Sequence, residues 1–284
     1  MYQEKVKNLF KKFFLNGKKY NFGNSLSLFF FPIYILFLRK YGAFQCIKII
    51  PIIKLINNDL ALFFLAELNF YKGYYAKSLE LLKSLKSKYP LNEDIYYLIS
   101  KNLIRMGFYE NAIQNLFSLL KISKRKKNWL MIANNINNKK QFKKFKKYFL
   151  NTYNISEITD ISLVNYYSEA ALNAKQYFEA KNIWTNFIKE NNKIKIIKNS
   201  NNTDIRRKGR RALLHLRKVL ERNEILFFII SGTLLGCIRN KDLLSYDKDI
   251  DIGVFKNDVS YYILEKIIEN SGFFEIMPTK HKDY

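Results

Sequence analysis

A pattern that recurs at a fixed spacing constrains the fold of this chain more than any other sequence feature. Residues 61–90 are typical of two helices that flank a turn at Gly73. One period later, the next segment has matching residues at the turn and in the second helix: Gly107 for Gly73, Tyr109 for Tyr75, Ala112 for Ser78 and Leu116 for Leu82. Such repetition predicts an array of helical hairpins, because each hairpin must bury its apolar face against its neighbours.

The pattern returns farther along the chain, after one intervening unit. Ala180 and Trp184 lie two periods beyond Ala112 and Leu116, so the spacing is kept across that unit. The intervening unit should turn near Lys140, and it fits the pattern only after a slip of one residue, through Phe142, Phe145 and Phe149. We therefore expect one irregular hairpin inside an otherwise regular array.

The period and the small residues at the helix contacts resemble the tetratricopeptide repeat, whose units are about 34 residues long. We expect repeats of this type over residues 55–192. A small residue such as Ala112 lets paired helices approach closely, while Leu116 fills the gap between neighbouring pairs. The resemblance implies a concave surface that holds a peptide, a partner protein or a neighbouring domain. A generic bundle of helical hairpins is the alternative interpretation.

Composition and charge favour a helix-rich chain of two domains. The 284 residues are 48% hydrophobic and include only ten Gly and four Pro, which argues against a loop-rich sandwich. A formal net charge of +25 attracts anions such as nucleic acid, anionic lipid head groups or phosphorylated glycans. Lysine is spread along the whole sequence. The sequence also has no stripe of aromatic and basic residues of the kind that binds single-stranded nucleic acid. We therefore expect no nucleic-acid partner.

The N-terminal residues and the cysteines indicate where the protein works. Residues 1–54 are predicted to form divergent helices that turn at Gly42. The apolar run over residues 26–38 is too short to span a bilayer, so it is either a buried helix pair or an interfacial helix on an anionic membrane. Cys46 and Cys237 have no ligand spacing, which indicates a reducing compartment. The expected location is the cytoplasm, with peripheral contact to the inner face of the cytoplasmic membrane as an addition.

A polar segment rich in Lys and Asn, residues 190–211, separates the array from a second expected domain at residues 205–284. The segment ends in a basic cluster formed by Arg206, Arg207, Lys208, Arg210 and Arg211. The cluster is either a solvated helix face or a contact with substrate phosphates or an acidic membrane surface.

A strand followed by a tight turn comes next. The apolar run Leu226–Ile230 predicts a strand buried on both faces. It ends in Ser231, Gly232 and Thr233. Glycine permits the backbone to turn abruptly into a helix beginning with Leu234, and it leaves backbone amides exposed to an anion. This turn is therefore predicted to bind phosphate.

Acidic and apolar residues then alternate from Asp247 to Val254 and predict a second strand. With a period of two residues, Asp247, Asp249 and Asp251 project from one face while the isoleucines between and after them enter the core. Three carboxylates this close repel one another, and a divalent cation removes the repulsion. Mg²⁺ prefers carboxylate oxygens, phosphate oxygens and water. The sequence thus predicts a magnesium site at Asp249 and Asp251, with Asp247 as a third catalytic carboxylate.

These two segments together resemble the LicD family, which includes fukutin and fukutin-related protein. The resemblance is carried by Ser-Gly-Thr-Leu-Leu-Gly-Cys-Ile-Arg at residues 231–239 and by Tyr-Asp-Lys-Asp-Ile-Asp-Ile-Gly at residues 246–253. Family members resemble nucleotidyltransferase-fold enzymes that move a phospho-alcohol, such as phosphocholine or ribitol phosphate, from a CDP-activated donor to a glycan. The resemblance implies an α/β nucleotidyltransferase-type domain in the last third of the chain.

The resemblance also implies roles for single residues. Asp249 and Asp251 would bind Mg²⁺, and the substrate-binding residues would be Ser231, Gly232, Thr233 and Arg239. Lys248 stands where the family usually has another Asp, which lowers the local negative charge and weakens a second metal site. Tyr246 stands where the family often has Trp.

The part of the sequence that follows the aspartates is shorter than the corresponding part of the family pattern. The sequence ends at Tyr284, soon after Asp251, with room for a helix at residues 259–270 and a strand at residues 274–277, whereas family domains continue further. We therefore expect only the N-terminal part of such a domain. Downstream, only weak candidates for a further site residue remain: Glu275, His281 and Asp283.

Three functions follow from these features. The leading hypothesis is a Mg²⁺-dependent transferase that moves a phospho-alcohol from a CDP-activated donor to a cell-surface glycan, in lipopolysaccharide or capsule biosynthesis, and uses its helical repeats to dock a protein partner. The alternative is a truncated, catalytically inactive LicD-like protein that acts as an interaction scaffold. A third interpretation keeps the fold and makes tRNA or the target of a toxin the substrate, which the net charge permits.

Overall fold

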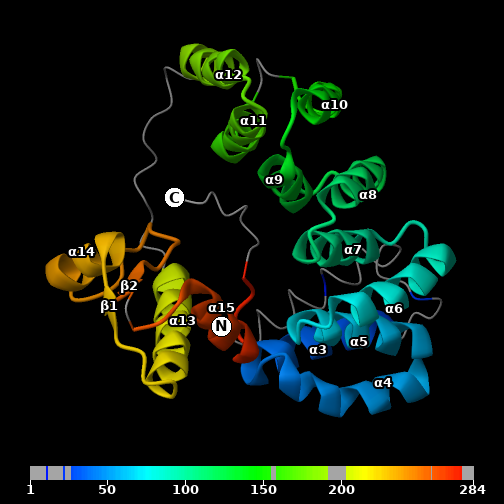
Figure 1. Cartoon of the computed structure of the whole chain (residues 1–284), viewed down its shortest axis with the longest axis vertical. Helices are drawn as coiled ribbons and strands as arrows, with labels where there is room; N and C mark the ends of the chain where they lie inside the picture. The colour runs from blue at the N-terminus through cyan, green and yellow to red at the C-terminus, as the bar shows by residue number, and fades with distance from the viewer. Residues whose placement is uncertain are drawn as a thin grey trace. The chain divides into compact units, whose positions relative to one another are not determined.

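The computed structural model describes residues 11, 22, 27–154, 158–190, 203–256 and 258–276 (Figure 1). The described residues are mostly helical and divide into two compact units, one up to residue 194 and one within residues 195–276. We call the described part of the first unit the array and residues 203–276 the C-terminal unit. The expectation of a helix-rich chain is confirmed, and the only strands among the described residues are a pair in the C-terminal unit.

The array is a succession of helices, most of them about four turns long. In chain order they are α3 (Ser27–Tyr41), the 3₁₀ helix η1 (Phe44–Ile49), α4 (Ile50–Ile56), α5 (Asn58–Tyr71), α6 (Tyr75–Lys88), α7 (Glu93–Arg105), α8 (Tyr109–Ile122), α9 (Lys126–Asn135), α10 (Lys139–Leu150), α11 (Ile161–Asn173) and α12 (Tyr177–Glu190). The closest neighbours include α5 with α6, α7 with α8, and α11 with α12, which are also consecutive in the chain. Each of these pairs is a helical hairpin.

The turns within these hairpins repeat the same backbone geometry. Gly73 and Gly107 have φ of 78° and 79°, and Lys175, at the corresponding position two periods after Gly107, has φ of 58°. This left-handed conformation is easy for glycine and rare for other residues. The residues that follow the two glycines, Tyr74 and Phe108, also agree, with φ of −84° in both and ψ of 58° and 60°. The predicted turn at Gly73 and its recurrence at Gly107 are therefore confirmed.

The hairpin between the regular ones turns earlier than expected. Lys140 lies in the first turn of α10, and the connection runs over residues 136–138. Asn138 sets this boundary because its side-chain oxygen accepts a hydrogen bond from the Gln141 amide at 2.9 Å. Helix α9 packs mainly on α11, so this unit is irregular, as the missing glycine indicates.

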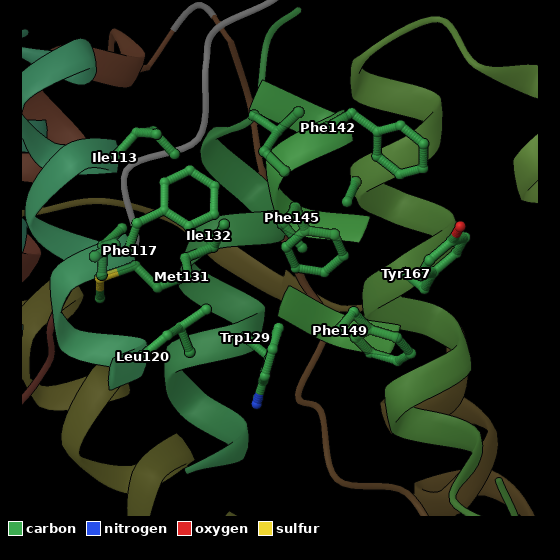
Figure 2. Close-up of a cluster of buried hydrophobic side chains, with 14 of the residues drawn as sticks. Ile113, Phe117, Leu120, Trp129, Met131, Ile132, Phe142, Phe145, Phe149 and Tyr167 are labelled. Carbon is green, nitrogen blue, oxygen red and sulfur yellow. The ribbon is translucent and has the colours of Figure 1, made fainter. Parts of the chain in front are cut away.

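Helix α10 contributes a row of aromatic rings to the core of the array (Figure 2). Phe142, Phe145 and Phe149 are at most 3% exposed and lie on one face of the helix. The Trp129 ring meets those of Phe145 and Phe149 edge-on, with centroids 5.6 Å and 5.4 Å apart. The slip of one residue in the repeat is thus compensated by large rings that fill the space between α9, α10 and α11.

The apolar N-terminal helix α3 is part of a second core in the array. Phe31 and Tyr34 are buried, and the Tyr34 ring stacks on Phe64 of α5 with centroids 3.8 Å apart. Leu26, the first residue of the apolar run, lies outside the described residues. After α3 the chain turns at Gly42, whose φ is 82°. None of the described helices is long and apolar enough to cross a membrane.

The C-terminal unit combines three helices with two short strands. Its elements are α13 (Thr203–Glu221), β1 (Phe227–Ile229), α14 (Ser231–Asn240), β2 (Ile252–Val254) and α15 (Tyr261–Asn270). The strands are antiparallel and pair Phe228 with Gly253. The Phe228 ring lies over Gly253, 2.5 Å from the position that a Cβ would occupy there. The bare glycine backbone therefore provides the surface on which this ring packs.

Several sequence predictions about this unit are wrong. The predicted strand Leu226–Ile230 is not buried on both faces, because Leu226, which precedes β1, is 71% exposed and Phe228 within β1 is 42% exposed. Strand β2 begins only after Asp251. Helix α13 begins at Thr203, inside the polar segment predicted to separate the domains, and α14 begins at Ser231 instead of Leu234. Residues 274–276 form no strand, and Met277 lies outside the described residues.

The aspartate segment fails to continue the strand for a local reason. The Asp249 amide donates to the side chain of Asp247 at 3.2 Å, and the Asp251 amide donates to the Thr233 hydroxyl at 2.9 Å. Amides occupied in this way are not available to a strand ladder. Residues 247–251 are therefore an irregular segment that leads into β2.

Candidate functional site

The candidate site is centred on Gly232, in the first turn of α14. The side-chain oxygen Oδ2 of Asp247 occupies the space that a Cβ at this position would need. Oδ2 of Asp251 lies 3.9 Å from the same point. Two carboxylates thus converge over a backbone without a side chain, an arrangement that only glycine permits.

Thr233 fixes the second of these carboxylates relative to the helix. Its side chain is buried, and its hydroxyl accepts the hydrogen bond from the Asp251 amide. The Ile230 amide donates to the Asp251 carbonyl at 3.2 Å, so the backbone of Asp251 is held from both sides. Ser231, between these contacts, has φ of 48°, a strained conformation for a residue other than glycine. Such strain is typical of functional sites, where the surroundings hold the backbone in place.

A cavity of about 330 Å³ opens beside Gly232. One wall is the glycine turn together with the segment that carries the aspartates, and the other wall is the N-terminal half of α13. The lining residues are Ile205, Lys208, Gly209, Ala212, Gly232, Thr233, Leu243, Leu244, Asp247, Lys248, Asp249 and Ile250. Its size suits part of a nucleotide or a phospho-alcohol, and its walls are mainly apolar with a few polar groups.

A charged contact joins α13 to the loop that forms the rim of this cavity. Arg210 donates to both oxygens of the Asp242 carboxylate, at 2.8 Å from Nε and 2.6 Å from Nη2. Arg206 lies 3.5 Å from the same carboxylate. The Arg210 guanidinium is the main reason why the pKa of Asp242 lies below its ordinary value. This bidentate pair positions the neighbouring Leu243 and Leu244, which line the cavity.

The three aspartates near Gly232 differ from Asp242 in having no cationic partner. Among the described residues of the C-terminal unit, no basic side chain forms an ion pair with Asp247, Asp249 or Asp251. Although the chain has a net charge of +25, these clustered carboxylates have no basic partner among the described residues, so they are available to bind a cation from solution.

The residues present fit Mg²⁺ better than a metal held entirely by protein. Among the residues that the structure describes, no group of three His, Cys, Asp or Glu side chains could hold a metal ion. Mg²⁺ is commonly bound by one or two carboxylates, with substrate phosphates and water completing its shell. The carboxylates of Asp247 and Asp251, side by side over Gly232, match that requirement.

The structure brings together most of the predicted site residues. Gly232, Thr233, Asp247 and Asp249 line the cavity, and Asp251 lies next to the first two of them. Asp249 is exposed, so the expectation that all three aspartates share one strand face is wrong. The reason is the irregular backbone before β2.

Two predicted substrate-binding residues lie outside the cavity lining. Arg239, in the last turn of α14, is exposed and donates to the Tyr246 hydroxyl at 3.3 Å, which ties it to the residue before Asp247. Ser231 contributes its strained backbone instead of a lining side chain. His281 and Asp283, the weak downstream candidates, lie outside the described residues.

Sequence reasoning missed the contribution of α13 to the site. Lys208, Gly209 and Ala212 form the wall opposite Gly232, and a Cβ on Gly209 would lie 2.7 Å from a Leu243 methyl group. The basic cluster at residues 206–211 is a signal of phosphate contact, but nothing in the sequence shows which of its members turn towards the cavity.

Comparison with known proteins supports this assignment for part of the chain. Residues 224–277 match the family model described as "LicD/FKTN/FKRP, nucleotidyltransferase domain". An uncharacterized protein of Rickettsia typhi is 38% identical over 45 residues, which are 16% of this chain and 15% of that protein. An uncharacterized protein of Rickettsia prowazekii is 42% identical over 41 residues, 14% of this chain and 15% of that protein.

These matches are short. The aligned part of this chain spans only about 15% of the length of either rickettsial relative. No solved structure matches the chain. The match over residues 224–277 confirms the resemblance for the segment that holds the glycine turn and the aspartates, and this segment is similar to the nucleotidyltransferase domain of a phosphotransferase-type family.

Proposed function

We propose that this protein is a Mg²⁺-dependent transferase that moves a phospho-alcohol, such as phosphocholine, from a CDP-activated donor to a cell-surface glycan. The observation that supports this most is the convergence of the Asp247 and Asp251 carboxylates over Gly232, within the segment that matches the LicD model. An acidic pair over bare backbone, beside a cavity, is the arrangement expected where a metal-bound diphosphate is held.

The residues of the site would divide the work as follows. The backbone of Gly232 and Thr233, at the N-terminal end of α14, would hold the donor phosphates, because helix amides favour an anion there. Asp247 and Asp251, whose carboxylates converge over Gly232, are the metal ligands that the geometry favours, and Asp249, which the sequence predicts as a ligand, lines the same cavity as the third carboxylate. Mg²⁺ would neutralise the charge that develops on the departing phosphate. Lys208, on the opposite wall, would add a positive charge near the donor.

The array would bind a partner protein that brings the glycan acceptor. We propose that it is of the tetratricopeptide type, because its hairpins turn at Gly73, Gly107 and Lys175, which are spaced at multiples of one period. Such arrays hold peptides or proteins in a concave surface, so a protein partner of the glycan-assembly machinery is the expected ligand. The reaction would take place in the cytoplasm, with contact to the inner face of the cytoplasmic membrane.

Binding of CDP-choline to the purified full chain tests the metal and donor assignments. Isothermal titration with Mg²⁺ present should show binding that is lost with EDTA and weakened about tenfold or more in Asp251→Asn, the range seen when support of a metal site is removed. Asp258→Asn removes the same charge from an exposed position outside the cavity and should bind within about twofold of the wild type. Equal binding by wild type and Asp251→Asn contradicts the metal assignment.

A turnover assay separates the enzyme from an inactive scaffold. Radiolabelled phosphocholine should pass from CDP-choline to a glycan extract in the presence of Mg²⁺ and the full chain. Mg²⁺-dependent binding without any transfer or hydrolysis, with acceptors from several bacterial surface glycans, supports the scaffold alternative. RNA binding that weakens steeply with salt would favour the third interpretation instead.

A further inference from the structure

Helix α4 exposes apolar side chains on the side that points away from the core of the array. The helix packs mainly against η1 and α5 (Figure 1). Ile50 and Ile53 face this core and are at most 8% exposed. Ile52 is 57% exposed and Leu55 is 89% exposed, and no other large apolar side chain among the described residues is more exposed than Leu55. The outer side of a surface helix is normally polar, so α4 reverses the usual pattern.

The exposed apolar side chains of α4 lie on one side of the helix. They are Pro51, Ile52, Leu55 and Ile56. With 3.6 residues per turn, these positions fall one turn apart in pairs, opposite the two buried isoleucines. Ile47 of η1, just before α4, is also 45% exposed. A continuous apolar patch of this kind marks a place where another molecule or a membrane makes contact.

Two lysines accompany this patch, Lys48 at the end of η1 and Lys54 within α4. Both side chains are exposed, and neither has a hydrogen bond, an ion pair or a ring contact among the described residues. Lys48 lies one helical turn before Ile52, and Lys54 lies on the flank of α4. We call these two lysines and the exposed apolar residues at positions 47, 51, 52, 55 and 56 the α4 surface.

No acidic residue nearby in the sequence offsets the charge of the two lysines. Residues 27–58 include no Asp or Glu. The next acidic residue, Asp59, already accepts a hydrogen bond from the Tyr89 hydroxyl at 2.5 Å and forms an ion pair with Lys88 at 2.5 Å. The α4 surface therefore combines apolar side chains with positive charge that is free to attract an anion.

This combination fits an anionic lipid surface better than a second copy of the chain. A symmetric dimer would place the same patch on both subunits, so the lysines of one copy would face those of the other without an acidic partner from this segment. A membrane satisfies both features at once. Apolar side chains enter the boundary between head groups and acyl chains, while lysine ammonium groups reach the anionic head groups.

We propose that the α4 surface docks the protein onto a membrane that contains anionic lipid, with Ile52 and Leu55 inserted and with Lys48 and Lys54 at the head groups. The surface differs from the apolar run at residues 26–38, which sequence analysis considers as an interfacial helix. The described part of that run, in α3, contributes instead to the core of the array. The proposal rests on the membrane contact included in the proposed function, but it does not require transferase activity.

Flotation of the full chain with vesicles tests the apolar part of the surface. Wild type should bind vesicles that combine phosphatidylcholine with phosphatidylglycerol. Ile52→Gln/Leu55→Gln should bind them about tenfold or more weakly, because burying one such side chain is worth about a tenfold change in binding. The matched control, Leu91→Gln/Phe178→Gln, changes two apolar side chains of the array that are 73% and 74% exposed. It should bind within about twofold of wild type.

The charged part of the surface is tested with the same vesicles. Lys48→Gln/Lys54→Gln should bind about tenfold or more weakly, because each basic residue close to an anionic surface contributes about a fivefold change. Lys121→Gln/Lys181→Gln removes the same charge from exposed positions elsewhere in the array and should stay within about twofold of wild type. Vesicles of phosphatidylcholine alone should bind wild type as weakly as the mixed vesicles bind the Lys48→Gln/Lys54→Gln variant.

Hydrogen exchange locates the contact on the chain. With mixed vesicles present, peptides covering residues 44–58 should exchange more slowly, and peptides of α8 should not change. The two α4-surface variants alter exposed positions, so their unfolding curves followed by tryptophan fluorescence should match that of wild type. A loss of vesicle binding can then not be attributed to misfolding.

The proposal is overturned if wild type does not bind the mixed vesicles, or if either control loses as much binding as its partner variant. It is also overturned if sedimentation of the free chain shows a dimer that Ile52→Gln/Leu55→Gln dissociates, because the surface would then hold a second copy.

A cross-test separates this proposal from the donor site. Asp251→Asn should float with vesicles like wild type, and Ile52→Gln/Leu55→Gln should bind CDP-choline with Mg²⁺ like wild type. Failure of the CDP-choline titration thus leaves vesicle binding to be judged alone, and failure of flotation leaves the donor site to its own titration.

Discussion

The array and the C-terminal unit hold their shapes by different means. The array buries large apolar side chains throughout its length, including Trp129, Phe145 and Phe149. In the described residues of the C-terminal unit, the buried apolar side chains are few: Leu220, Ile225 and Leu244. The fold of that unit depends instead on single polar contacts and on glycines whose backbone is covered by neighbouring side chains.

This difference shows where each unit is sensitive to substitution. An apolar core loses stability in proportion to the volume removed and is indifferent to pH. A site held by single hydrogen bonds and an ion pair loses little stability when one contact is removed, but the position of a particular carboxylate changes. Substitutions in the two units can test this contrast, and the largest effect is expected in the array.

Phe145→Ala should lower the free energy of unfolding of the array by about 3–5 kcal/mol, because it opens a cavity beside Trp129. The measurement is urea unfolding followed by tryptophan fluorescence, which reports on the array since both tryptophans, Trp129 and Trp184, lie in it. Phe178→Ala is the matched control, because this ring is 74% exposed and its loss should change stability by no more than about 0.5 kcal/mol. Similar changes in the two variants would mean that burial does not stabilise the array.

Thr233→Val should have a smaller, local effect in the C-terminal unit. The substitution keeps the shape of the buried side chain but removes the hydroxyl that accepts from the Asp251 amide, which costs about 1–3 kcal/mol for a donor left without a partner. Hydrogen exchange of peptides covering residues 250–256 should become faster. The tryptophan unfolding curve of the array should stay unchanged, and a shift of that curve would show that the two units are not energetically separate.

Asp242→Asn should have the smallest effect and the clearest dependence on pH. Because Arg210 lowers the pKa of Asp242, the ionised carboxylate stabilises the fold above the ordinary Asp pKa of about 3.9, and this contribution is lost as the pH falls through the lower pKa of the folded state. Hydrogen exchange of residues 241–245 should therefore differ between wild type and variant at pH 7 and converge towards pH 3. A difference that persists in acid would show that the ion pair is not its cause.

The regular part of the array could be predicted because its determinants are local. A glycine at the turn and a small residue in the following helix recur at a fixed spacing, and both act within a few residues of their position. The turn of the irregular hairpin lies earlier than the pattern predicts because the Asn138 side chain, not a glycine, sets the start of α10. The sequence pattern shows where the array departs from regularity but not how the aromatic rings refill the space.

The chemistry of the candidate site could be predicted, but its geometry could not. The glycine turn and the aspartates are identified by residue type, whereas the alternating pattern at residues 247–251 favours a strand that does not form. The Thr233 hydroxyl that occupies the Asp251 amide lies 18 residues away in the chain, and the Arg210 partner of Asp242 lies 32 residues away. Contacts at such separations are set by tertiary packing, which a single sequence does not display.

The exposed surface of β1 has the same explanation. An apolar run such as Leu226–Ile230 indicates a strand, but it does not reveal how many layers cover the strand. The two strands and three helices described in the C-terminal unit leave Leu226 and Phe228 accessible to solvent. The composition of a strand therefore indicates how hydrophobic the strand is, but it does not indicate which elements cover the strand.

The bare backbone of Gly232 also determines how this pocket could be redesigned. Every amino acid other than glycine would push the Asp247 carboxylate aside, so Gly232 itself is not a position that an engineer can vary. The opposite wall does, because Ile205 and Ala212 on α13 face the same space with side chains that can be enlarged or reduced. A library aimed at a new ligand should therefore randomise α13 and leave the glycine turn as it is.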